Sequence, residues 1–372
     1  MISFLTSEYV LILVWLGLVA VFSKNFSFTK KEYVIGYEDK VERYYWLFAF
    51  LVFFPIIWMA GHRDLWGDTT AYVIHFNNMP TDLKELGSYL EGINKDKGFY
   101  FISVIIKQFA RDNKEIYFMI LALAQGLSIV SIFRKYSDNY LLSVFLFIAS
   151  TDYISWMFNG IRQFTAVTII FAATALVLNK RFIPSLLVVI AASTFHQSAL
   201  IMIPFIIIAY GQAWNKRTLL FILVVLFIVL FVSNFTNLLD SSLAITQYSN
   251  VVKEYKEMGD EGTNPIRVLV YSMPTIIAFI ERRKIQQSGN ILLNFCTNMS
   301  MISTGLYIIS MFTSGVFLGR LPIYCSLYGY ILLPWEVNNI INESNKKWVW
   351  TIMIFGYLLF YYYQMHIAWS LI

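Results

Sequence analysis

Long runs without formal charge dominate this sequence of 372 residues. Charged side chains make up 14 % of it, against about 25 % in an ordinary soluble domain, and hydrophobic residues make up 58 %. A helix of roughly 20 apolar residues crosses the hydrocarbon core of a bilayer. Runs without Asp, Glu, Lys or Arg that reach this length occur at 182–215, 218–239, 285–319 and 348–372. The chain is therefore predicted to be an integral membrane protein with several spans, which excludes a soluble enzyme, a disordered chain and a nucleic-acid binder.

Eleven apolar segments are predicted to form helices. They lie at about 5–22, 44–61, 116–133, 140–158, 163–178, 182–210, 218–234, 266–281, 291–312, 321–337 and 347–366. Segment 182–210 is too long for one straight span, and basic pairs flank it at 180–181 and 216–217. If both pairs face the cytoplasm, it forms a broken-helix hairpin whose two helices meet near 193–197. The predicted fold is all-α: one polytopic membrane domain over residues 1–372, with about 12 transmembrane helices.

The distribution of basic residues predicts how the chain is oriented, because Lys and Arg in short loops mark the cytoplasmic side. Six short loops together hold 16 of the 28 Lys and Arg residues: 24–43, 134–139, 179–181, 211–218, 282–284 and 337–347. With these loops in the cytoplasm, the long loops 62–115 and 235–265 lie outside. Within the first of them, the stretch 98–110 is interrupted by Lys107 and is predicted to be an interfacial helix.

A charged motif follows the second predicted span, at residues 61–72. It contains Arg63, Asp64, Asp68 and Tyr72, close to two glycines that permit close backbone approach. Asp68 precedes a predicted helix at 69–76, so its simplest role is an N-cap. Arg63 and Asp64 have an equally simple alternative as a solvated pair at the membrane surface. The density of charge at a membrane exit favours a functional role.

Two arginines are predicted at helix starts on the outer side. Arg162, followed by Gln163, comes after the turn signal Asn159-Gly160, and Arg320 comes just before Pro322, which suits a first helical position. A cation at a helix N-terminus is unfavourable unless an anion joins it. The pair therefore indicates an oxyanion or phosphate site. The alternative for Arg162 is contact with lipid headgroups.

A third motif, Ser193 to Ala199, lies at the apex of the predicted hairpin and contains His196 and Gln197. Burying an ionisable side chain inside an apolar run costs free energy, so such a residue is expected to have a functional role. The alternative for a lone histidine is a purely structural role as a hydrogen-bonded residue. No second His or Cys lies at ligand spacing, so no metal site is expected. The sequence Asp96-Lys97 opens the interfacial helix, where Asp96 is predicted to act as a cap.

These motifs, in this order, resemble the EpsG/Wzy-like family of bacterial polysaccharide polymerases. The matching segments are Arg63 to Tyr72, Lys97 to Tyr100, Ile161 to Gln163 with Ala166, Phe195 to Ala199, and Arg320 with Tyr324. The resemblance covers about residues 60–330. It implies an integral-membrane glycosyltransferase with GT-C-like architecture that needs no nucleotide sugar, metal or other cofactor. Such proteins join oligosaccharide repeat units carried on undecaprenyl pyrophosphate, at the outer face of the cytoplasmic membrane, into capsule, exopolysaccharide or O-antigen.

The resemblance and the residue chemistry together predict a division of roles. Arg162 and Arg320 stabilise the pyrophosphate leaving group, and Asp68, Asp64 and His196 are alternative bases for the acceptor hydroxyl in an inverting, single-displacement transfer. The predicted substrate-binding residues are Arg63, Asp64, Tyr72, Lys97, Gln163, Gln197 and Tyr324. The expected partners are lipid-linked oligosaccharides, membrane lipids, a flippase and chain-length regulator proteins, and no nucleic acid.

Three other functions fit a chain of this length and hydrophobicity. A lipid-linked oligosaccharide flippase would also use arginines for pyrophosphate, but its charges would line a central cavity open to both sides. A membrane O-acyltransferase would centre on a histidine with a cytoplasmic acyl-CoA route, whereas His196 is predicted to face outward. Another lipid-linked glycosyltransferase or ligase would share the same site chemistry.

The predicted orientation can be tested by labelling single cysteines in a cysteine-free background. The positions expected to react from outside are Trp66, Gly160 and Gln197. The positions expected to react from inside are Arg181, Lys216 and Arg283. Labelling of position 197 from the cytoplasm alone would remove His196 from the predicted outer site.

Overall fold

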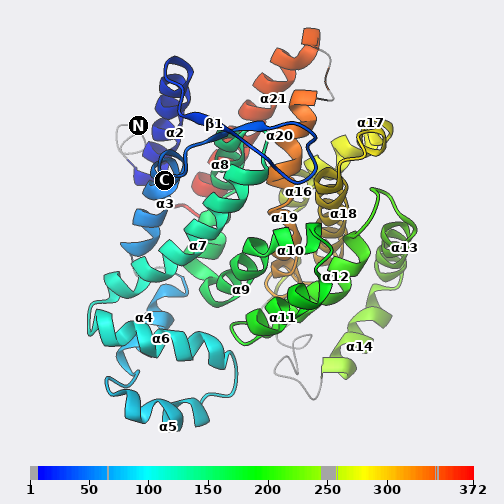
Figure 1. Ribbon diagram of the computed structural model, residues 1–372. Helices are drawn as coiled ribbons and strands as arrows, with labels where there is room; N and C mark the ends of the chain where they lie inside the picture. Colours follow the sequence, from blue (N-terminus) through cyan, green and yellow to red (C-terminus); the bar gives the residue numbers. More distant parts are fainter. Residues whose placement is uncertain (1–6, 65–66, 244–256, 258, 340, 342) are drawn as a thin grey trace. The chain divides into compact units, whose positions relative to one another are not determined.

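A computed structural model describes residues 7–64, 67–243, 257, 259–339, 341 and 343–372 (Figure 1). The chain divides into two compact units, and each is described here by itself. Unit 1 consists of Met1–Leu200 and Trp348–Ile372, and unit 2 consists of Ile201–Lys347. In the described residues the regular structure is helical, apart from one two-stranded ribbon in unit 1. The predicted all-α class is confirmed.

The helices of unit 1 coincide with the predicted apolar segments. They are α2 (Glu8–Asn25), α3 (Trp46–Gly61), α7 (Lys114–Tyr136), α8 (Tyr140–Ala149), α9 (Ile161–Ala172), α10 (Thr174–Leu178), α11 (Phe182–Ser193), and α21 (Glu343–Tyr362) with η5 (Tyr363–Ala368), α21 beginning in unit 2. The first residues of α7 are held by Asn113, whose Oδ1 accepts hydrogen bonds from the amides of Glu115 and Ile116.

Helices α3, α7 and α9 form the packed centre of unit 1. Gly126 of α7 lets α3 approach closely, because a Cβ at this position would lie 2.6 Å from Ile57 Cδ1. The buried side-chain amide of Gln125 joins α7 to α9. Its Nε2 donates to the carbonyl oxygen of Ile161 and to Thr165 Oγ1. Close packing and a satisfied polar side chain thus hold the start of α9 against the middle of α7.

Short helices gather at one end of α3 and α7 (Figure 1). They are α4 (Thr69–Asn77), η1 (Leu83–Glu85), α5 (Leu86–Glu91) and α6 (Lys97–Ala110). The helix predicted at 98–110 is therefore present as α6, and its interfacial position stays a prediction. Lys107 is buried, and its ammonium group donates to the carbonyl oxygens of Phe76 and Asn77 at 2.6 and 3.0 Å. The lysine thus caps the last turn of α4 and joins it to α6.

The opposite end of α7 carries a β-ribbon in the predicted loop 24–43, which sequence analysis did not anticipate. Strands β1 (Thr29–Glu32) and β2 (Val41–Tyr44) pair antiparallel, with Thr29 opposite Tyr44. Arg134 at the end of α7 forms a two-pronged ion pair with Glu32 and donates to the carbonyl oxygen of Tyr44. Hydrogen bonding from Arg134 lowers the pKa of Glu32 to about 2. The ribbon is thus fastened to α7 by one guanidinium.

The predicted span 140–158 is bent rather than straight. Helix α8 is followed by the π-helix η2 (Tyr153–Asn159) at an angle of 74°. Thr151 has a positive φ of 63°, and the break residues Ser150, Thr151 and Asp152 are buried. Asp152 accepts a hydrogen bond from the indole of Trp156 at 3.2 Å. Thr151 Oγ1 donates to the carbonyl oxygen of Ser150, so a side chain at the bend satisfies a backbone group there.

Unit 2 is built around one long buried helix, α18 (Ile291–Met311). The other elements of this unit are α12 (Met202–Ala209), α13 (Lys216–Leu230), α14 (Val232–Leu243), α16 (Pro265–Ile280), α17 (Arg282–Gln287), η4 (Leu318–Arg320), α19 (Ile323–Ser326) and α20 (Gly329–Asn339). Two asparagines of α18 hold the loop between α12 and α13. Asn294 accepts from the Ala213 amide, and Asn298 donates to the Ala209 carbonyl.

Four described helices are long and apolar enough to cross a membrane, and two bent pairs raise this number to six. The chain is thus a multi-pass membrane protein. The second bent pair, α13 with α14, turns by 102°, so the predicted span 218–234 is also not straight. Shorter apolar helices cover 44–61, both halves of 182–210, and 266–281. A total of about 12 crossings is not shown by these helices and stays a prediction, as does the single-domain organisation.

Candidate functional site

The centre of the candidate site is an ion pair at the start of α9. Arg162 is the second residue of this helix, as predicted, and its Nη1 donates to Asp96 Oδ2 at 2.9 Å. The side chain of Arg162 is 32 % exposed, whereas that of Asp96 is 3 % exposed. The anion that the helix start was predicted to attract is thus, in this structure, a carboxylate of the chain itself. The Arg162 side chain is therefore only partly covered by the protein.

Asp96 sits in an unusual backbone conformation just before α6. It adopts φ 57° and ψ 37°, a left-handed geometry that Asp tolerates better than most residues. The predicted cap role is wrong, because its side chain makes no capping hydrogen bond and turns to Arg162 instead. Oδ1 is buried without a hydrogen-bond partner, although the Gln197 amide faces the carboxylate. Burial raises the pKa of Asp96, and the charge of Arg162 offsets part of that rise.

Tyr72 of α4 completes this ion-pair centre. Its hydroxyl accepts a hydrogen bond from the backbone amide of Arg162 at 3.5 Å, and its ring packs edge-on against Phe99 of α6. Burial raises the pKa of Tyr72, which favours the neutral phenol. The phenol thus satisfies one of the free amides at the helix start, which is a group that phosphate oxygens commonly bind.

His196 lies where the helix breaks, as the sequence predicted. Helix α11 ends at Ser193, and helical structure resumes with η3 (Gln197–Ile201) before α12. The His196 side chain is half-buried, and its Nδ1 lies 2.7 Å from Ser198 Oγ. The amide of Gly98 donates to the carbonyl oxygen of Thr194 at 2.9 Å. The helix break therefore contacts the start of α6, next to Asp96.

Arg63, a predicted substrate-binding residue, is engaged inside the protein. Nη1 donates to the carbonyl oxygens of Met157 and Phe158 at 2.5 and 3.1 Å, and the guanidinium lies over the ring of Phe118 at 4.0 Å. Burial lowers the pKa of Arg63 to about 9, so the group keeps its charge at neutral pH. These contacts join the end of α3 to the end of η2. In this structure Arg63 therefore positions the charged motif at residues 61–72.

The two aspartates of the first motif differ in their surroundings. Asp64 is exposed, and Asp68 is half-buried, at the residue before α4. The alternative role of Asp68 as a side-chain cap is not seen, because its carboxylate makes no capping hydrogen bond. Its backbone amide instead donates to Asn159 Oδ1 at 3.2 Å. The carboxylate is close enough to Tyr72 to influence that phenol electrostatically, which places it beside the ion-pair centre.

The remaining predicted residues of unit 1 lie around this centre at different depths. Lys97 and Gln197 are exposed, whereas Gln163 is buried. Sequence reasoning gave Asp96 only a capping role and missed Asn159 as a partner of Asp68. The sequence feature that pointed to a role for Asp96 in the site was its position, immediately before a predicted helix and beside Lys97-Gly98.

Arg320 and Tyr324 belong to unit 2. Arg320 is exposed and ends the short turn η4, and Tyr324 is buried in α19. Arg320 was predicted at a helix start, and it lies two residues before Pro322, the N-cap residue of α19. Helix α19 contains only four residues, with Pro322 as its N-cap, so few aligned peptide dipoles face the guanidinium.

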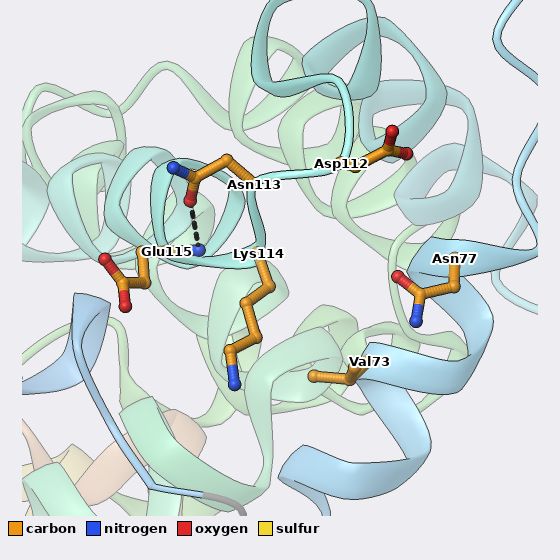
Figure 2. A pocket seen from close by; sticks show the side chains of 6 residues that line it. All are labelled: Val73, Asn77, Asp112, Asn113, Lys114 and Glu115. Carbon is orange, nitrogen blue, oxygen red and sulfur yellow. Dashed lines mark hydrogen bonds between the residues drawn. The ribbon is translucent and has the colours of Figure 1, made fainter.

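A polar hollow lies between Val73 and Asn77 of α4 and the residues around the start of α7 (Figure 2). Its volume is about 530 Å³. The residues that line it are Val73, Asn77, Asp112, Asn113, Lys114 and Glu115. Within the described residues, no three His, Cys, Asp or Glu side chains are grouped so as to hold a metal ion.

The helices and this site define a multi-pass membrane protein with an arginine–carboxylate centre at a helix start. The sequence profile of the EpsG family matches residues 45–369, which is most of the chain. The chain therefore belongs to the EpsG family, and this membership links it to polysaccharide synthesis. No curated protein and no solved structure matches it.

Gly67 provides a test of the contact between the first two motifs. Its φ is +58°, and a Cβ would lie 2.1 Å from Asn159 Oδ1, so Gly67→Ala is expected to strain the backbone and displace the partner of Asp68. We expect a stability loss on the order of 1–2 kcal/mol, measured by thermal unfolding in detergent. Gly87→Ala is the matched control, since no atom lies within 4 Å of a Cβ there. Equal melting temperatures for both variants would contradict the contact.

Proposed function

We propose that this protein is a polysaccharide polymerase: a membrane glycosyltransferase that joins oligosaccharide repeat units carried on undecaprenyl pyrophosphate at the outer face of the cytoplasmic membrane. The observation that carries the proposal is the partly exposed guanidinium of Arg162 at a helix start, where it pairs with Asp96 while the backbone amide of Arg162 donates to Tyr72. Membership in the EpsG family supports the substrate class. Capsule, exopolysaccharide and O-antigen are all products of this chemistry.

Arg162 is proposed to bind the pyrophosphate of the donor. A guanidinium presents two parallel N–H groups to phosphate oxygens, and the amides at the start of α9 add positive potential. When the glycosidic C–O bond to pyrophosphate breaks, the electron pair remains on the leaving phosphate. A preorganised arginine stabilises that charge as it develops. Arg320 is proposed as a second cation for the same group, on the strength of the motif order.

The acceptor side requires a base that accepts the proton of the attacking sugar hydroxyl. Asp68 is favoured because its half-buried carboxylate makes no capping hydrogen bond and lies beside Tyr72. Asp96 is less suited, because its carboxylate already pairs with Arg162. His196 is proposed to bind substrate as a hydrogen-bonding group. The new bond forms on the opposite face of the anomeric carbon from the departing pyrophosphate, so the transfer inverts configuration.

The remaining predicted roles follow from this reaction. Lys97, Gln163, Gln197 and Tyr324 are proposed to contact the substrate, and Asp64 lies at the aqueous edge. Lipid-linked oligosaccharides are the substrates, drawn from surrounding lipid. A flippase that delivers them and a chain-length regulator are the proposed protein partners.

The role of Arg162 predicts the behaviour of its closest replacement. Arg162→Lys keeps the charge but loses the planar fork, so elongation is expected to fall at least tenfold while membrane insertion stays normal. The measurement uses purified protein in liposomes, given a polyprenyl-pyrophosphate repeat unit and no nucleotide sugar. Arg217→Lys serves as a control, because this exposed arginine lies in unit 2 and outside every motif. Wild-type polymer from both Arg162→Ala and Arg320→Ala would rule out the phosphate role.

The choice of base predicts a second comparison. Asp68→Asn preserves shape but removes basicity, and it is expected to abolish elongation while the donor still binds. His196→Gln should retain measurable activity, since an amide can still hydrogen-bond, whereas His196→Ala should be severe. Single-turnover elongation at matched expression separates these outcomes. An active Asp68→Asn beside an inactive His196→Gln would make the histidine the base.

A further inference from the structure

Unit 2 contains a buried carboxyl group that the proposed glycosyl transfer does not use. Glu336 lies in α20 and is 0 % exposed. Neither of its carboxylate oxygens has a hydrogen-bond partner among the described residues. An ionised carboxylate in this position would be buried without a counter-charge, which is among the least favourable arrangements in a protein. This side chain therefore requires an explanation of its own.

Among the described residues, the helices packed against α20 offer polar groups, and no cation contacts Glu336. Helices α18 and α19 contain no charged residue. The charged residue of α16 is Arg267, and its guanidinium lies over the ring of Tyr271, which packs on Tyr307 near the far end of α18. Just beyond α16, Glu281 and Lys284 pair with each other at the surface. The titratable group within electrostatic range of Glu336 is the buried thiol of Cys296.

Buried hydroxyl groups extend from this carboxyl along α18. Cys296, Ser300 and Ser303 are spaced by four and three residues, so they lie on one face of the helix. Gly329 of α20 is close to the same face, since a Cβ there would lie 3.5 Å from Ser300 Oγ. The serine and threonine hydroxyls that, like the carboxyl, are buried without a hydrogen-bond partner among the described residues are those of Thr297, Ser300, Ser303 and Ser326. Several unsatisfied polar atoms in one interior indicate a site for a small polar ligand.

We propose that Glu336 is an internal proton-binding site, which holds a proton at neutral pH and is hydrated by water bound to the neighbouring hydroxyls of α18. A bound proton removes the uncompensated charge, and each hydroxyl can donate to or accept from water. The site belongs to the interior of unit 2 and is independent of the proposed glycosyl transfer. Ionisable groups buried in membrane proteins commonly bind protons in this manner.

The proposal predicts how stability depends on pH. The folded protein keeps a proton that the unfolded chain releases above a pH of about 4.3, so wild-type stability falls as pH rises. The folding equilibrium constant should change about tenfold per pH unit relative to Glu336→Gln, which lacks this slope. The measurement is thermal unfolding in detergent from acidic to alkaline pH. Glu343→Gln is the matched control, because Glu343 is 88 % exposed and pairs with Lys346.

Parallel pH profiles for wild type and Glu336→Gln would overturn the proposal. So would a Glu336→Gln variant that does not fold, because the neutral amide matches a protonated carboxyl in shape and charge. A second measurement uses wild-type protein and a hydrophobic carbodiimide, which adds across a protonated carboxyl without a leaving group and forms a stable acylurea. Peptide mass spectrometry should find the adduct on Glu336 at neutral pH. An adduct on Glu343 without one on Glu336 would contradict the bound proton.

Discussion

The need to pair every backbone group in an apolar environment shapes this protein most strongly. A helix that ends or bends inside such an environment leaves carbonyl and amide groups that hydrocarbon cannot satisfy. In unit 1, groups from distant motifs satisfy them. Arg63 donates to the carbonyls at the end of η2, Gly98 donates to Thr194 where α11 has ended, and Tyr72 accepts from the Arg162 amide. The helix breaks therefore draw the three motifs of unit 1 together.

The same requirement separates two arginines that look alike in the sequence. Arg63 Nη1 donates to two carbonyl oxygens and the guanidinium lies over the ring of Phe118, so its charge is buried. Arg162 has one carboxylate partner and keeps about a third of its side chain exposed. Part of the Arg162 side chain is thus accessible, whereas the Arg63 side chain is buried against the end of η2. The proposed function uses this difference, since a donor phosphate would compete with Asp96 for the guanidinium of Arg162.

The sequence analysis predicted helix positions well because the signal is local. Charge-free runs mark where a helix is apolar, and the predicted segments in the described residues correspond to one helix or to consecutive shorter helices, as α19 and α20 do at 321–337. It did not predict the β-ribbon, because strands of four residues in a charged loop gain their stability from Arg134, about 90 residues away. The bends after α8 and α13 were also not predicted. The bend after α13 lies within an apolar run, whereas the bend after α8 lies at the polar residues 150–152, a local signal that was not used.

For the candidate site, the sequence by itself determined which chemical groups are present, in what order, and at which helix boundaries they stand. Arg162 at a helix start and His196 at a helix break follow from spacing and charge alone. Only the tertiary structure decided that Asp96 faces Arg162 and is not a cap, and that Asp68 meets Asn159 through its backbone. Such pairings depend on which segments lie side by side after packing, and a local pattern of charge and hydropathy contains no information about that.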